Sequence, residues 1–228
     1  AMSIVLHEII HILGFTAKLF PYYINPRTEM TLQGHYGRTT LAGIENMYLN
    51  VEPLTSMLRE YFDCPMLQGA ILENQDAPGS LGDHFERRVF GDEIMTASLM
   101  PHQKISQYTL AFLEGTGWYV PNYNYAEPYF FGQGEGCGFY ASGTAASSDP
   151  EYCTGSGMGC TQVGDSGGYC VTTGALEGYR VITAQPLLNC ENPAGVYYTP
   201  FANKQVYGRG LGSKCFTGNL AVSGSASL

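Results

Sequence analysis

Positive charge is scarce in this chain and is nowhere concentrated. Lys and Arg total 11 against 20 Asp and Glu, which gives a formal net charge of −9. Proteins that bind nucleic acids or anionic membrane surfaces depend on clustered Lys and Arg. The sequence therefore predicts no nucleic-acid partner and no electrostatic attraction to a membrane.

Long apolar runs are also missing. No stretch of 18 apolar residues occurs, and the tail GNLAVSGSASL is too polar for a membrane span or an anchor signal. The chain begins with Ala, without a basic segment followed by an apolar one, and enters a predicted helix at once. We expect it to be a fragment or a processed form of a longer protein.

Paired CxxC motifs are absent, although the chain has seven cysteines. Five of them fall between Cys153 and Cys215, in the half where Gly, Ser and Tyr dominate. This pattern favours a disulfide framework over a zinc ribbon, and it predicts an oxidising, extracellular or cell-surface location. Because seven is odd, one cysteine is free, pairs between chains, or has its partner outside the chain.

Hydrophobic spacing predicts three helices and few regular strands. Charged residues make up only 14% of the chain, a balance typical of loop-rich proteins. The expected elements are a helix over 2–13 ended by Gly14, a strand near 46–51, a helix over 54–62, an exposed loop over 73–83 and a helix over 105–113. Residues 1–120 and 121–228 are expected to form two units.

The first helix carries HEIIHILGF, residues 7 to 15. Helical spacing of i and i+4 places His7 and His11 on one face, where both can bind one Zn²⁺ ion. Glu8 lies beside them and can act as general base for a zinc-activated water. The alternative is a buried amphipathic helix whose two histidines only make hydrogen bonds.

A catalytic zinc site needs a third protein ligand. In compact metzincin sites Gly14 would allow a sharp turn, and the ligand would follow three residues later. That position is Ala17, which cannot bind a metal. The remaining histidines are His35, His84 and His102, and a downstream Glu is the alternative found in the other large zincin class.

Several segments together resemble the leishmanolysin family of metalloproteases. His84 precedes RRVFGDEIM (87–95), which is similar to the family's R-N-x-x-D-E-[LI]-M segment after its third histidine. The segments YFDCPMLQGAILENQ (61–75), YTLAFLEGTGWY (108–119) and AEPYFFGQGEGCGFY (126–140) also resemble family segments. In that family a long insertion, here about 16–80, separates the glycine from the third ligand.

The resemblance implies an α+β fold: a metzincin-like zincin subdomain with active-site helix, Met-turn and C-terminal helix, then a loop-rich, disulfide-stapled region. It implies that His7, His11 and His84 bind one Zn²⁺, that Glu8 is the catalytic base, and that Met95 forms a hydrophobic floor beneath the zinc, with Met100 as alternative. It also suggests a Cys64–Cys137 disulfide. His35 is expected at the surface, and His102 lies too near the next helix.

The implied function is a zinc metalloendopeptidase that acts on proteins or peptides, membrane-associated only through segments outside this chain. One alternative is a catalytically incomplete adhesion or binding module. Another is a cytosolic zincin with a glutamate ligand, which predicts free thiols. For Glu86, Asp92 and Glu93 we expect a solvated or salt-bridged turn rather than a carboxylate that accepts a proton from a ligand histidine.

Overall fold

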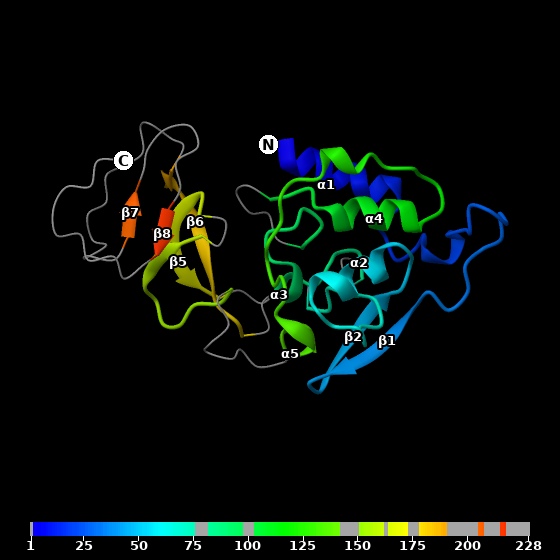
Figure 1. Cartoon of the computed structure of the whole chain (residues 1–228), viewed down its shortest axis with the longest axis horizontal. Coiled ribbons are helices and arrows are strands. Elements are labelled where there is room, and N and C mark those ends of the chain that lie inside the picture. The colour runs from blue at the N-terminus through cyan, green and yellow to red at the C-terminus, as the bar shows by residue number, and fades with distance from the viewer. Residues whose placement is uncertain are drawn as a thin grey trace. The chain divides into compact units, whose positions relative to one another are not determined.

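The computed structural model describes residues 2–75, 82–97, 103–141, 151–161, 164–172, 178–190, 205–207 and 215–217 (Figure 1). The chain divides into two compact units. Unit 1 comprises Ala1–Ala145 with Thr173–Tyr179, and unit 2 comprises Ala146–Thr172 with Arg180–Leu228. Helices and strands are both present, so the predicted α+β class is confirmed, whereas the metzincin arrangement stays a prediction.

Unit 1 begins with α1 (Met2–Leu13), the helix predicted over the same residues. The helix ends as its sequence indicates, because the amides of Gly14 and Phe15 turn back onto it. Gly14 N donates to His11 O and Phe15 N donates to Ile10 O, each at 3.1 Å, the hydrogen-bond pair of a Schellman cap. Gly14 has a φ of +149°, a conformation that favours glycine.

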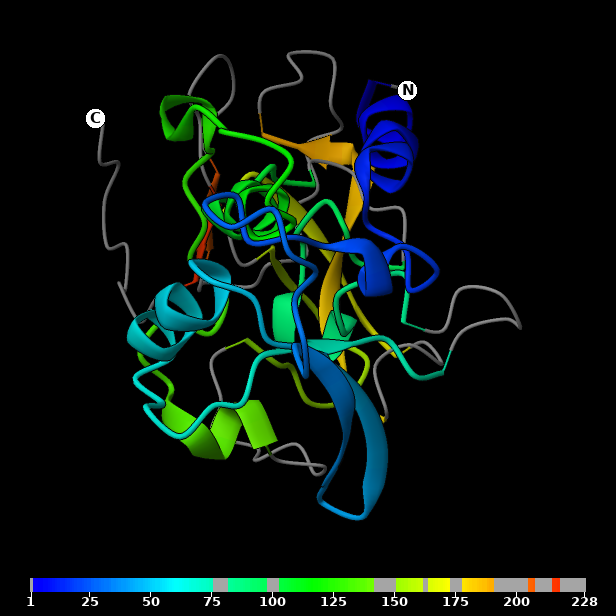
Figure 2. The same ribbon diagram turned by 90° about the vertical axis from the view of Figure 1, so that its right-hand side faces the viewer.

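A three-stranded antiparallel sheet follows, with the order β1 (Tyr36–Leu41), β2 (Ile44–Leu49), β3 (Ala70–Leu72). Ala42 and Gly43 connect β1 to β2 with positive φ angles of 49° and 84°, which matches the right-handed twist of a tight hairpin. The hairpin projects from the rest of unit 1 (Figure 2). The strand predicted at 46–51 corresponds to β2, which lies two residues earlier.

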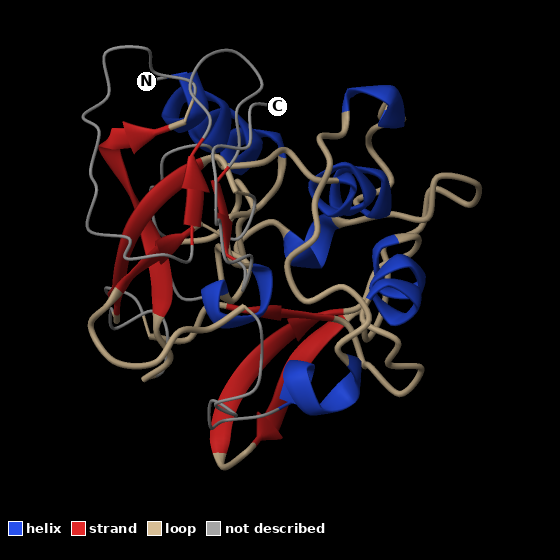
Figure 3. Ribbon diagram, turned by 60° about the vertical axis from the view of Figure 1, so that its left-hand side comes forward, coloured by secondary structure: helices blue, strands red, loops and turns tan. Residues whose placement is uncertain are grey.

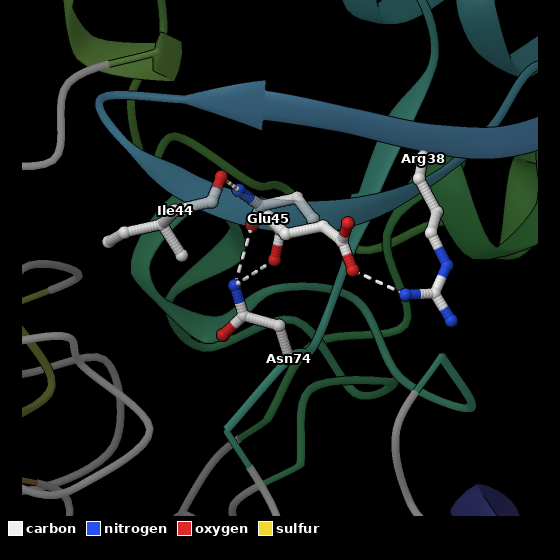
Figure 4. Close-up of polar contacts among 5 residues, drawn as sticks. Arg38, Ile44, Glu45 and Asn74 are labelled. Carbon is white, nitrogen blue, oxygen red and sulfur yellow. Dashed lines mark hydrogen bonds and ion pairs between the residues drawn. The ribbon is translucent and has the colours of Figure 1, made fainter.

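Polar contacts fasten the start of β2 to the segment after β3 (Figure 4). The side-chain amide of Asn74 donates to Glu45 O at 3.2 Å and to Asn46 Oδ1 at 2.8 Å. Arg38 forms an ion pair with Glu45 on the same hairpin. Both side chains of that pair are exposed, so the backbone ladder and the Asn74 contacts matter more to the hairpin than the charges do.

Two predicted helices pack against each other over an aromatic core. They are α2 (Leu54–Tyr61) and α4 (Gln107–Gly115). Phe15, which follows α1, lies 4.2 Å from Phe112 of α4 and 4.8 Å from Phe85 between ring centroids, and all three rings are fully buried. The core therefore fixes the end of α1 against the segment that follows His84.

Short elements complete unit 1: η1 (Phe20–Tyr22), α3 (Arg87–Phe90), η2 (Tyr123–Tyr125) and α5 (Gly136–Ala141). The suggested Cys64–Cys137 disulfide is confirmed and joins the end of α2 to α5. Tyr140 on α5 donates to Gly69 O and accepts from Ile71 N. These bonds attach residues beyond Val120 to unit 1, while the predicted division into domains at 120/121 stays a prediction.

Unit 2 is built from strands, shown in red with those of unit 1 in Figure 3. An antiparallel sheet has the order β4 (Met158–Cys160), β5 (Ser166–Val171), β6 (Val181–Asn189), and β7 (Gln205–Tyr207) pairs with β8 (Cys215–Thr217). Disulfides join Cys153 to Cys170 and Cys160 to Cys215. The region is thus disulfide-stapled as predicted, with more regular structure than expected.

Within the described residues, every helix is too short or too polar to span a lipid bilayer.

Candidate metal centre

Three histidines converge at one point of unit 1. His7 and His11 lie one turn apart on α1, and His84 comes from the segment just before α3. The Nε2 atoms of His7 and His11 lie 2.9 Å apart, and each lies 3.2 Å from Nε2 of His84. Among the described residues, these three form the one group of His, Cys, Asp and Glu side chains able to share a metal ion.

The opposite ring nitrogens show where the protons reside. Nδ1 of His7 lies 2.7 Å from Ile94 O, and Nδ1 of His11 lies 2.6 Å from Phe15 O. A carbonyl oxygen can only accept, so each Nδ1 carries a hydrogen, and a ring of this tautomer in its neutral form presents a lone pair at Nε2. Burial lowers the pKa of His7, which favours this neutral form.

Converging lone pairs repel one another unless a cation lies between them. Three nitrogens bound tetrahedrally to one zinc ion, at about 2.0 to 2.1 Å each, are about 3.3 Å apart. The observed separations of 2.9 to 3.2 Å are slightly shorter. Imidazole nitrogens suit a borderline-soft ion such as Zn²⁺, and two of the three rings are anchored through Nδ1. Donor type and spacing therefore both fit a zinc ion.

The three histidines open onto a cavity of about 470 Å³ that is also lined by Glu8, Ile12, Thr16 and Asp83. Glu8 is exposed, and its position next to His7 on α1 places it at the cavity. A carboxylate at the edge of a group of converging histidines is suited to accept a proton from water in the cavity.

Asp83 fixes the segment that carries His84. Its Oδ1 accepts from Ala17 N at 2.6 Å and from Thr16 Oγ1 at 3.1 Å. Ala17 is the position where a compact metzincin site would have its third ligand. The chain therefore returns from its insertion to that position, and Asp83 holds it there. Nothing in the sequence pattern distinguished Asp83 beyond its place before His84.

The turn around Met95 supports two of the three histidines. Ile94 O accepts from His7, and Met95 O accepts from Phe85 N, next to His84, at 2.8 Å. Met95 itself is completely buried. Its role as a floor beneath the metal stays a prediction.

The prediction of a solvated or salt-bridged turn is wrong for Glu93. The residue is 0% exposed, and its carboxylate accepts from Met95 N, Ser106 Oγ and Thr109 Oγ1. Burial raises its pKa to about 7, although these hydrogen bonds oppose the rise. Glu86 is also buried and caps α3 by accepting from Arg88 N. Asp92 is partly exposed.

The remaining candidates do not join the site. His35 is not a surface residue as predicted: it is 5% exposed, and its Nε2 donates to Phe20 O at 2.8 Å. Packing against Tyr23 and Tyr36 explains the burial. His102 and Met100 lie outside the described residues.

Comparisons with known proteins place these features in a wider context. A family model described as leishmanolysin matches residues 1–215. The chain is 33% identical over 191 residues to the ciliated left-right organizer metallopeptidase of Danio rerio, covering 82% of this chain and 30% of that protein. It is 32% identical over 230 residues to the Mus musculus protein of the same name, covering 94% of this chain and 32% of that protein.

A leishmanolysin-like peptidase of Caenorhabditis elegans is 34% identical over 170 residues, which cover 60% of this chain and 25% of that protein. The chain thus spans about a third or less of the length of these curated relatives.

Proposed function

The chain belongs to the leishmanolysin family, and from that premise we propose that it carries the zinc centre of a metalloendopeptidase, with His7, His11 and His84 as the ligands. The observation that carries the proposal is the convergence of three Nε2 atoms within 3.2 Å of one another, with two of the rings held by Nδ1–H donation to carbonyl oxygens.

When bound, zinc supplies Lewis acidity that polarises a peptide carbonyl and makes a nearby water more acidic. Glu8 takes the proton of the attacking water and transfers it to the leaving amine. Its exposed position in the cavity leaves its carboxylate accessible to water and to a substrate peptide. The substrates are proteins or peptides, as the relatives' name "metallopeptidase" suggests.

The three disulfides support an extracellular or cell-surface location, since such bonds persist in oxidising compartments. Membrane association would come from segments outside this chain.

Two variants separate metal binding from hydrolysis. Glu8→Gln keeps about one zinc per chain and lowers the hydrolysis of a peptide substrate by about 100- to 10,000-fold, the contribution of a general base. His84→Ala loses zinc, measured by elemental analysis after dialysis. Glu60→Gln changes an exposed carboxylate on α2, away from the cavity, and serves as the matched control.

Each outcome has a distinct meaning. Hydrolysis that survives in Glu8→Gln contradicts the role of the base. Equal zinc content in His84→Ala and wild type contradicts the ligand set. A wild-type chain that binds zinc but cleaves nothing supports the alternative function, a binding or adhesion module.

A further inference from the structure

Two side chains hold the opposite ends of one peptide group beside the metal centre. Met95 N donates to Glu93 Oε2 at 2.5 Å, and Ile94 O accepts from His7 Nδ1 at 2.7 Å. Ile94 O and Met95 N belong to the same peptide group. We propose that Glu93 is a positioning residue of the metal centre that acts on His7 through this peptide group. The inference rests on the proposed function, because it takes His7 as a zinc ligand.

The coupling follows from the polarity of the amide. A carboxylate that accepts from the N–H draws the proton toward itself and shifts electron density onto the carbonyl oxygen, because hydrogen bonds in series polarise one another. With its higher electron density, the carbonyl oxygen of Ile94 accepts a stronger hydrogen bond from His7 Nδ1–H. The imidazole then becomes a better donor at Nε2, and its ring orientation is fixed, as in carboxylate–histidine–metal arrangements.

The carboxylate of Glu93 is buried and, within the described part of the chain, meets hydrogen-bond donors but no cation. Ser106 Oγ donates to Oε1 at 2.9 Å, and Thr109 Oγ1 donates to the same oxygen. Among the residues that the structure describes, no Lys or Arg neutralises the carboxylate. The backbone N–H of Ser106 also donates to the carboxylate, and Met95 N donates to Oε2. The site has no solvent exposure, so electrostatic interactions in it are strong.

His11 provides an internal control. Its Nδ1 donates to Phe15 O at 2.6 Å, an anchor as short as that of His7. The amide of that peptide group, Thr16 N, donates to Gly14 O at 2.7 Å, a neutral carbonyl. The two ligands on α1 thus differ in whether a carboxylate lies behind their carbonyl partner.

Replacement of the carboxylate by an amide tests the inference. Glu93→Gln keeps an oxygen that can accept from Met95 N and removes the charge. At about pH 8, above the pKa of Glu93 of about 7, we expect the dissociation constant for zinc, measured by chelator competition, to rise about 10- to 100-fold. The Nδ1–H proton resonance of His7 should move upfield, and that of His11 should stay in place.

A structural control separates the relay from general loosening. Ser106→Ala removes a donor to Glu93 and the N-cap of α4 but leaves the Glu93–Met95 contact. It should lower the melting temperature while the His7 resonance moves much less than in Glu93→Gln, because the carboxylate and its bond from Met95 N remain. Should Glu93→Gln not fold, a scalar coupling across the hydrogen bond between Met95 ¹⁵N and Glu93 ¹³Cδ in the wild type supports the inference, and its absence overturns it.

Different experimental results would contradict the proposed zinc centre and the proposed action of Glu93 on His7. Wild-type protein that takes up no zinc overturns the proposed function. Wild-type protein that binds zinc through His84, alongside a folded Glu93→Gln variant with the same affinity and the same His7 resonance, overturns the relay alone. Equal shifts of His7 and His11 would also overturn it, since they indicate a general rearrangement.

Discussion

At the scale of single residues, Asp83 shows how a histidine far along the chain is positioned beside α1. His11 and His84 are separated by a long insertion, yet their Nε2 atoms lie 3.2 Å apart. The bonds from Asp83 to Thr16 and Ala17 join the end of that insertion to its beginning. The entropic cost of closing such a loop grows only slowly with its length, so a few local bonds suffice to place the third histidine.

We therefore predict that Asp83→Ala weakens zinc binding by about 10-fold, because His84 loses the anchor of its neighbouring residue. Chelator competition measures the effect. Asp83→Asn serves as the matched variant, since its amide oxygen can still accept from Ala17 N, and it should recover most of the affinity. Equal affinities in all three proteins would show that the aromatic core alone positions His84.

The environment of a side chain was predictable from the sequence where its chemistry constrains it, and was not predictable where it depends on packing against distant residues. That His7, His11 and His84 come together could be predicted because the spacing and the flanking residues are distinctive. Glu93 was misjudged since an acidic residue in a Gly-Asp-Glu turn is usually solvated. Its burial depends on donors from Ser106 and Thr109 in another element. His35 was misjudged for the same reason, because Tyr23 and Tyr36 cover it.

At the scale of elements, Glu93 joins the turn that carries Met95 to the first turn of α4. Ser106 caps α4 by accepting from Tyr108 N at 3.0 Å and donates to Glu93 with the same hydroxyl. The carboxyl group is buried in the folded state and solvated in the unfolded one. Its protonation is therefore coupled to the stability of this junction.

The sign of the coupling follows from the raised pKa of Glu93, from 4.5 to about 7. Between these values the folded protein holds the proton and the unfolded chain does not, so stability from this group is lost as pH rises from 4.5 to about 7. Relative to Glu93→Gln, the metal-free wild type should lose about 3 kcal/mol over this range, at 1.36 kcal/mol for each pKa unit.

Denaturant unfolding of both proteins across this pH range measures the difference, and subtraction removes the titration of the histidines. Parallel stability curves would contradict the prediction. The charged carboxylate is the less stable form of this junction and also the form on which the inference for His7 depends. The fold would thus tolerate a destabilising group beside its metal centre.

Helices were easier to predict than strands or the solvent exposure of individual side chains. α1, α2 and α4 have the apolar spacing that defines helices, and glycines lie at the ends of α1 and α4, whereas α3 has only four residues. β1 was missed because its residues alternate between exposed and half-buried with little apolar contrast. In α1 only His7 and Ile10 are buried, and Ile12 is 80% exposed. Periodicity predicted this helix but not which side chains the fold covers.

At the scale of the whole molecule, disulfides act separately on the two units. Cys64–Cys137 lies in unit 1, and the other two bonds lie in unit 2. Composition and cysteine count predicted a framework, but the pairing depends on which segments the fold brings together. Cys190 takes part in none of the three bonds, and its buried thiol donates to Gly164 O at 3.8 Å. The odd cysteine is therefore assigned to the interior of unit 2.

This assignment predicts one titratable thiol per chain in denaturant without reductant, and none accessible in the native protein. The cytosolic alternative predicts several accessible thiols.

Within unit 1, Cys64 and Cys137 close a loop with a sequence separation of 73 residues. By the chain-entropy relation, their bond stabilises the folded state by about 4 kcal/mol. The double variant Cys64→Ser/Cys137→Ser should unfold at lower denaturant concentration than the wild type.

The matched control is Cys153→Ser/Cys170→Ser, which opens a loop with a separation of 17 residues in the other unit. Zinc binding reports on unit 1 alone, because all three histidines lie there. The control should therefore keep zinc at denaturant concentrations where the Cys64→Ser/Cys137→Ser variant has released it. Release at the same concentration from both variants would mean that the two units unfold together, and that the metal centre depends on unit 2 as much as on its own disulfide.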